Sequence, residues 1–106
     1  MKKFLCAGLM AHALFCISAN AADAGAAQAL AKKSGCFACH NVDKKVLGPS
    51  YKQVSAKYKN DTGAEARLLA KVKTGGSGTW GDIPMPPNAH VKDEDIKTVI
   101  EWILTL

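Results

Sequence analysis

Two cysteines and a histidine within five residues, Cys36-Phe37-Ala38-Cys39-His40, constrain this chain more than any other feature of its sequence. The spacing brings two thiols onto one short turn and sets an imidazole directly after them. Three kinds of site use such a group: a disulfide, a zinc site, and the Cys-x-x-Cys-His sequence to which c-type haem is attached. Other features of the sequence indicate which of these three sites is present.

The N-terminus has the pattern of a cleaved secretory signal. Lys2 and Lys3 make it basic, residues 4–17 are apolar, and Ser18-Ala19-Asn20-Ala21 ends in the small-x-small pattern that a signal peptidase accepts. The apolar stretch is short for a bilayer span and lacks the flanks of a membrane anchor. We therefore expect residues 1–21 to be removed on export and residues 22–106 to form a single domain.

The exported domain is too small to be stable on an ordinary core. It would bury only about 60% of its unfolded surface, so we expect an additional stabilising element: a disulfide, a metal ion or a covalently held cofactor. A disulfide across so short a loop would constrain the unfolded chain little. Zinc would need four ligands, and the domain offers only a poorly spaced set, Cys36, Cys39, His40 and His90. One covalently attached haem, held through Cys36 and Cys39 with His40 as proximal ligand, is the favoured interpretation because it would supply the missing core.

Helical patterns account for most of the domain, and no segment has the alternation of a strand. The clearest pattern starts at Ile96, where apolar residues recur at i, i+3, i+4, i+7 and i+8 after an acidic first turn. A thioredoxin-like disulfide is disfavoured because it belongs to a strand–helix context. The sequence predicts an all-α domain, with about four helices around the haem. The expected helices span residues 24–33, 50–58, 64–73 and 93–104.

A loop of residues 74–91 separates the last two expected helices. Three of its residues are prolines and one is Trp80, so the second half is stiff, and long stiff loops in compact domains are usually functional. Met85 lies between prolines and is the only methionine left after signal removal. A rigid backbone suits the aiming of a thioether at iron better than the filling of a core. We expect Met85 as the sixth ligand and keep His90 as the weaker alternative.

The chain from Ala24 to Leu106 resembles the small class I bacterial cytochromes c, specifically the cytochrome c-551/c-552 (c8) group. The matching stretches include Gly35-Cys36-x-x-Cys39-His40, Gly48-Pro49-x-Tyr51-Lys52, Trp80-Gly81-x-Ile83-Pro84-Met85-Pro86-Pro87-Asn88 and the closing Glu101-Trp102-Ile103-Leu104. This resemblance covers essentially the whole exported domain. It implies the small class I cytochrome c fold and a place in the periplasm.

The resemblance also implies roles for residues around the haem. In such proteins the carbonyl at the Pro49 position accepts a hydrogen bond from the proximal histidine and so orients it. The Trp80 position donates to a haem propionate, and the Asn88 position lies beside the methionine sulfur. Lys71 falls near a position where relatives often carry a propionate-binding arginine.

Axial ligation by both His40 and Met85 would leave no coordination position for a substrate. The expected function is therefore that of a soluble periplasmic one-electron carrier of a respiratory chain, and not of an enzyme. By analogy with the family, the haem edge should be rimmed by apolar residues. The candidates are Val46, Leu47, Ile83, Pro84, Pro86 and Pro87. Surrounding lysines would steer encounters with acidic partner surfaces. They are drawn from Lys32, Lys33, Lys44, Lys45, Lys52, Lys57 and Lys59.

Partner classes known for the family are nitrite reductases, cytochrome c peroxidases, terminal oxidases and membrane cytochrome donors. Nucleic acid is a poor candidate, because 12 of the 14 basic residues remain after signal removal against 9 acidic ones. The default oligomeric state is a monomer. Two alternatives stay open: a gas-binding sensor or haem enzyme with a labile Met85, and a haem subunit permanently docked to a larger oxidoreductase.

If haem is the core of this domain, the domain without haem should not fold. We predict that a double variant, Cys36→Ala with Cys39→Ala, is largely unfolded, because it cannot hold the group that fills the centre. Far-ultraviolet circular dichroism of the purified variant beside the wild type is the measurement. Wild-type helicity in the variant would contradict the prediction.

Overall fold

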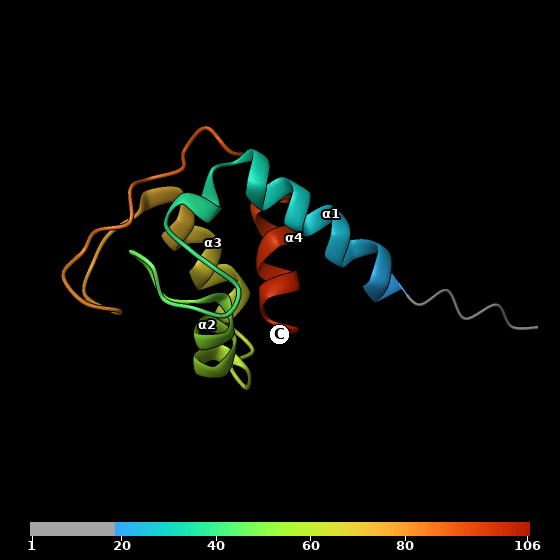
Figure 1. The fold of residues 1–106 in the computed structure, drawn as a ribbon, viewed down its shortest axis with the longest axis horizontal. Coiled ribbons are helices and arrows are strands. Elements are labelled where there is room, and N and C mark those ends of the chain that lie inside the picture. The colour runs from blue at the N-terminus through green and yellow to red at the C-terminus, as the bar shows by residue number, and fades with distance from the viewer. Residues whose placement is uncertain (1–18) are drawn as a thin grey trace, which may run out of the picture.

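The computed structural model describes residues 19–106, so most of the predicted signal peptide, residues 1–21, lies outside the described part. Four helices and one short 3₁₀ turn follow one another along the chain (Figure 1). They are α1 (Ala19–Lys33), η1 (Cys36–Ala38), α2 (Tyr51–Tyr58), α3 (Ala64–Thr74) and α4 (Asp93–Ile103). None of the helices in this described region is long and apolar enough to cross a membrane.

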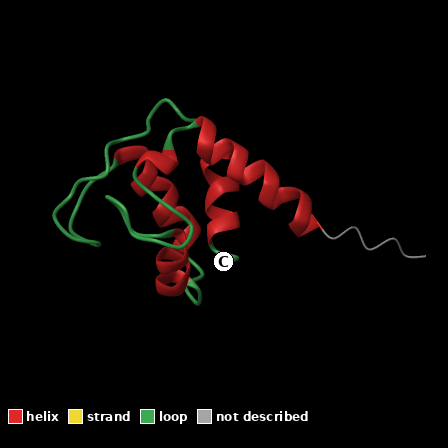
Figure 2. Cartoon of the chain, viewed as in Figure 1, coloured by secondary structure: helices red, strands yellow, loops and turns green. Residues whose placement is uncertain are grey.

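The all-α prediction is confirmed, since the described residues form no strand and only one isolated antiparallel bridge, between Gly76 and Met85 (Figure 2). Three predicted helices match to within one residue at each end. The exception is α1, which begins at Ala19 instead of at the expected residue 24, so that it continues upstream of the predicted boundary.

Local signals in the sequence explain where the helices begin and end. Ser50 caps α2: its hydroxyl accepts from the Gln53 amide at 3.1 Å, and the Gln53 side chain accepts from the Ser50 amide at 2.9 Å. Gly35 has φ 78°, the left-handed conformation that glycine adopts most easily, and it turns the chain from α1 into η1. Each of these signals acts within a few residues, which is why the limits marked by them could be predicted, whereas the start of α1 could not.

The back of the domain is built where α1 packs against α4 (Figure 1). The residues of α1 that face this contact are Ala27 and Ala31, with 1% and 0% of their surface exposed, whereas Leu30 is only half-buried. They join a core cluster that includes Val99, Trp102 and Ile103 of α4. Small side chains four residues apart let the two helix backbones approach closely, so the alanines of α1 are core residues.

The remaining helices attach to α4, which is the central element. Both α2 and α3 pack on it, and the Ser55 hydroxyl of α2 donates to the carbonyl of Leu106 at 3.1 Å. Two long loops, residues 39–50 and 75–92, lie largely on the side of α3 and α2, and the end of the second loop returns to the C-terminal end of α1 (Figure 2). The helices thus form a frame, and the loops close it on the open side.

The close approach of α1 and α4 yields a stability prediction. Replacing Ala31 with leucine forces a larger side chain into a filled contact, and overpacking of this kind costs about 1–3 kcal/mol in free energy of unfolding. Ala29→Leu is the matched control, because Ala29 lies on the exposed face of the same helix and should change this free energy by less than about 0.5 kcal/mol. Guanidinium denaturation of both variants makes the comparison, and equal effects would refute the packing argument.

Candidate functional site

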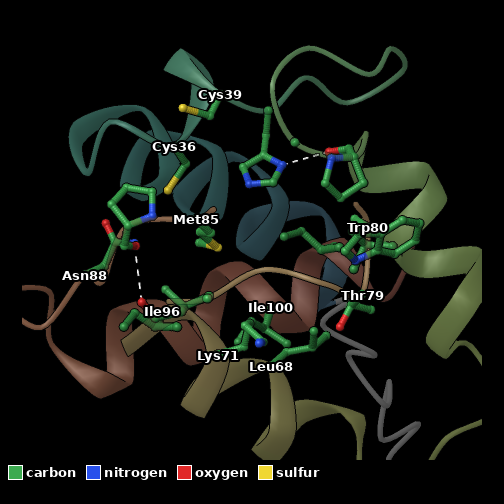
Figure 3. Close-up of a pocket in the computed structure, with 18 of the residues that line it drawn as sticks. Cys36, Cys39, Leu68, Lys71, Thr79, Trp80, Met85, Asn88, Ile96 and Ile100 are labelled. Carbon is green, nitrogen blue, oxygen red and sulfur yellow. Dashed lines mark hydrogen bonds between the residues drawn. The ribbon is translucent and has the colours of Figure 1, made fainter. Parts of the chain in front are cut away.

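A cavity of about 590 Å³ lies between the helix frame and the two loops. Its volume falls in the range of pockets that hold organic cofactors and ligands. Apolar side chains of α3 and α4 contribute to its wall, among them Leu68, Ile96 and Ile100 (Figure 3). Residues from η1 and from both long loops complete the lining, so segments distant in sequence meet around one space.

Cys36 and Cys39 both line this cavity, and both are free thiols. The turn of η1 holds them in place, because the amides of Cys39 and His40 donate to the Cys36 carbonyl at 3.2 and 3.0 Å. Burial raises the pKa of the Cys36 thiol, and the nearby Tyr51 side chain opposes that rise only in part. Both cysteine side chains are half-buried and reach the cavity from one short turn.

The His40 ring is oriented by the loop that follows it. Its Nδ1 lies 2.7 Å from the carbonyl oxygen of Pro49, and since a carbonyl can only accept, Nδ1 carries the proton. In the neutral ring this leaves the lone pair on Nε2, the form in which imidazole binds metals. The ring also stacks on Tyr51, with centroids 5.3 Å apart and an interplanar angle of 22°.

Gly48 lets the His40 ring approach the backbone. A Cβ at position 48 would lie only 2.5 Å from Cε1 of His40 and 2.9 Å from its Nδ1, so any larger residue displaces the ring. The amide of Gly48 donates to the Cys39 carbonyl at 2.8 Å, which joins the loop to the Cys-x-x-Cys-His turn. The glycine is needed here for space.

Met85 also lines the cavity, from the loop between α3 and α4 (Figure 3). Its amide donates to the Gly76 carbonyl and its carbonyl accepts from the Gly76 amide, both at 2.9 Å. Gly75, buried and with φ 68°, packs so closely on the Met85 carbonyl that a Cβ there would collide with it. The backbone of Met85 is thus held against the start of its own loop, and the prolines on either side stiffen it further.

The structure separates the two candidates for the sixth ligand. Met85 faces the cavity with Cys36, Cys39 and His40, whereas His90 is exposed and lines a different, smaller hollow beside the end of α1. The zinc alternative also loses its ligand set. Nowhere in residues 19–106 do three or more His, Cys, Asp or Glu side chains gather in a way that could hold a metal ion.

The other residues singled out by the resemblance also lie on the cavity wall. Lys71, Trp80 and Asn88 all line it (Figure 3). The Asn88 amide group donates to the Pro86 carbonyl at 3.1 Å, and the Lys57 ammonium lies over the Trp80 ring at 5.7 Å from its centroid. Sequence reasoning did not identify the packing of Gly48 on the His40 ring or the stacking of Tyr51, since neither leaves a periodic or charge signal in the chain.

The residues around the cavity fit a covalently attached haem. Two free thiols on one turn, an imidazole with a free Nε2 and a thioether on a stiff loop all face one largely apolar space. Lys71 and Arg67 add positive charge to the lining, as the propionates of a haem require. Cys36, Cys39 and His40 thus bring two thiols and an imidazole to one wall.

Comparison with known proteins gives a consistent result. A sequence profile of the Cytochrome c family matches residues 24–106. The chain is 57% identical over 77 residues to cytochrome c-551 of Allochromatium vinosum, covering 73% of this chain and 82% of that protein. It is 54% identical over 86 residues to cytochrome c-552 of Nitrosomonas europaea, covering 78% of this chain and 84% of the relative.

The structural comparison agrees. The crystal structure of wild-type Nitrosomonas europaea cytochrome c552 aligns with a TM-score of 0.72 and 52% identity, over 74% of this chain and 98% of that one. The fold that the resemblance implied, a small all-α class I cytochrome, is confirmed.

The fit between Gly48 and the His40 ring can be tested directly. Gly48→Ala should lower the free energy of unfolding of the haem-bearing protein by about 1–3 kcal/mol, because the new methyl group displaces the ring and strains its bond to Pro49. Gly25→Ala is the control: nothing lies within 4 Å of a Cβ there, and an alanine in place of a helical glycine should raise stability by up to about 1 kcal/mol. Denaturation followed at the Soret band decides, and the packing argument fails if both variants become more stable.

Proposed function

The chain belongs to the cytochrome c family, and on that premise we propose that it is a periplasmic one-electron carrier. One haem c is attached through thioethers to Cys36 and Cys39, and His40 and Met85 are its axial ligands. The export signal of residues 1–21 supports the periplasmic location, because it would deliver residues 22–106 across the inner membrane.

The observation that carries this proposal is the shared cavity. The thiols of Cys36 and Cys39, the imidazole of His40 and the thioether of Met85 reach it from η1, from the chain just after it and from the loop before α4. The haem iron supplies reversible exchange of one electron between its ferric and ferrous forms. With His40 and Met85 both holding the iron, no coordination position would remain for a substrate, and electron transfer is the chemistry that such an arrangement would support.

The protein's part in electron transfer is to keep both ligands still. His40 is held by the Pro49 carbonyl, and Met85 is held by two backbone hydrogen bonds to Gly76. Ligands fixed in this way change position little between the two oxidation states, so electron transfer needs little reorganisation. The hydrogen bond that Nδ1 of His40 donates to the Pro49 carbonyl also raises the basicity of Nε2, the proposed coordinating nitrogen.

Two polar side chains on the cavity wall suit the haem propionates. Lys71 and Trp80 line this wall, and both were expected at propionate positions from the family resemblance. Lys57 lies over the rings of both Tyr58 and Trp80, at 5.8 and 5.7 Å, and so links α2 to the loop that carries Trp80. A charged lysine and an indole N–H would both donate to a carboxylate here.

An exposed apolar rim would serve for docking. Val46, Leu47 and Ile83 are 51%, 53% and 61% exposed, and Leu47 and Ile83 also line the cavity. Electrons would pass to and from partners at this edge, through small transient interfaces of less than about 1,200 Å². Lysines near the rim would steer the encounter with acidic surfaces on these partners. The partner classes we propose are nitrite reductases, cytochrome c peroxidases, terminal oxidases and membrane cytochrome donors. A monomer suffices for this role.

An absorption spectrum of the periplasmically expressed protein tests the proposal. The oxidised and reduced wild type should show a sharp low-spin c-type spectrum with a methionine–iron charge-transfer band in the ferric form. Adding CO to the reduced protein should leave the spectrum unchanged. A prompt shift with CO would indicate an open sixth position and favour a sensor or enzyme, and the absence of a haem spectrum would overturn the whole assignment.

Met85→Ala should remove the charge-transfer band and allow CO to bind, because it deletes the thioether and nothing else from the cavity wall. Ile83→Ala is the matched control, since Ile83 belongs to the same loop and is exposed. It should retain the band and the resistance to CO. A Met85→Ala protein with the wild-type spectrum would show that another residue is the ligand.

A further inference from the structure

Lys73, near the C-terminal end of α3, makes three polar contacts with a single ammonium group. Its Nζ donates to the carbonyl of Val91 at 2.8 Å and to that of Ala89 at 3.2 Å, and it lies 2.9 Å from a carboxylate oxygen of Asp93. An ammonium has three N–H donors, so each of them has an acceptor here. The side chain is 29% exposed, which places these contacts partly out of water.

The three acceptors lie together at the downstream end of the loop that carries Met85. Ala89 and Val91 belong to that loop, and Asp93 is the first residue of α4. The neighbouring residue of α3 makes a second attachment to the same stretch, because the Asn88 amide donates to the Val72 carbonyl at 2.9 Å. Hydrogen bonds and one ion pair therefore attach the last turns of α3 to the chain from residue 88 to residue 93.

This attachment is close enough to Met85 to influence its position. Three residues separate Met85 from Ala89, and two of them, Pro86 and Pro87, have fixed φ angles. A stiff connection of this length transmits a displacement instead of absorbing it. The upstream side of Met85 is held by Gly76, so the methionine lies between two anchors, of which only the downstream one depends on a side chain.

We propose that Lys73 is a positioning residue, which keeps Met85 at the iron by fixing the downstream end of its loop. Loss of the ammonium should let residues 85–91 open more often, and an external ligand should then replace Met85 more readily. The inference rests on the proposed ligation by His40 and Met85. It adds a residue that is not part of the cavity lining.

A purely structural role would make Lys73 an ordinary link between α3 and α4. Lys97 provides that comparison, since it joins the same two helices through Glu65 at 3.5 Å and also pairs with Glu101 at 4.0 Å. Its side chain is 54% exposed, and its ion-pair partners lie on α3 and α4, not on the loop. Lys97→Gln therefore removes the same charge and a link between the same helices without releasing the loop.

The experiment uses the haem-bearing protein as wild type, Lys73→Gln, Lys73→Arg and Lys97→Gln. Cyanide binding to the ferric form measures replacement of the sixth ligand, and native-state hydrogen exchange of the Met85 and Asn88 amides measures opening of the loop independently of the iron. Lys73→Gln should speed cyanide binding and both amide exchanges about fivefold, as the loss of a partly exposed charged hydrogen bond implies. Lys73→Arg, which can donate to the same acceptors, and Lys97→Gln should stay within twofold of wild type.

The outcomes separate this inference from the proposed function. A wild type without the methionine–iron band would overturn both. A wild type with the band, together with equal rates in Lys73→Gln and Lys97→Gln, would overturn the role of Lys73 alone. Asp93→Asn serves as a milder variant if Lys73→Gln does not fold: it should shift the same two rates in the same direction, and no shift would count against the proposal.

Discussion

The structure depends on one constraint: a domain of this size surrounds a cavity of about 590 Å³ instead of filling its own centre. Only one side of that cavity is closed by helix packing, where α1, α2 and α3 gather on α4. The opposite side is closed by loops, which have no regular hydrogen bonding of their own. A covalently attached haem in this cavity would therefore stabilise the folded domain, as a continuous apolar core stabilises larger domains.

The loops meet this constraint by attaching themselves to neighbouring backbone. The loop after η1 returns to it through the Gly48–Cys39 hydrogen bond and presents the Pro49 carbonyl to His40. The loop before α4 folds back on its own start, so that Gly76 holds Met85 from both its amide and its carbonyl. His40 and Met85 are thus each oriented by hydrogen bonds formed within about ten residues, and α3 holds the downstream part of the Met85 loop.

Features that depend on residues close together in the sequence could be predicted, whereas features that depend on distant residues could not. Most helix limits and the haem-attachment pattern of Cys36, Cys39 and His40 depend on neighbours in the chain, and they could be predicted. Met85 lies on the cavity wall with these residues, and its role as the sixth ligand stays a prediction. The burial of Ala27 and Ala31 could not be predicted, because alanine carries a weak hydrophobic signal and its burial depends on where α4 lies. The contacts of Lys73 were missed for the same reason, since its acceptors follow sixteen to twenty residues later and are mostly backbone carbonyls, which every sequence contains.

The sequence by itself determined an all-α domain, an export signal pattern and a haem-attachment turn with one candidate methionine, because capping residues, apolar periodicity and ligand spacing are local and chemical properties. Only the tertiary structure decided that Met85 and not His90 faces the cavity, that Gly48 must be small to admit the His40 ring, and that α3 grips the methionine loop. These facts depend on the direction in which side chains and carbonyls point after distant segments have packed together. The three-dimensional arrangement of the helices sets that direction, and no local pattern in the sequence determines this arrangement.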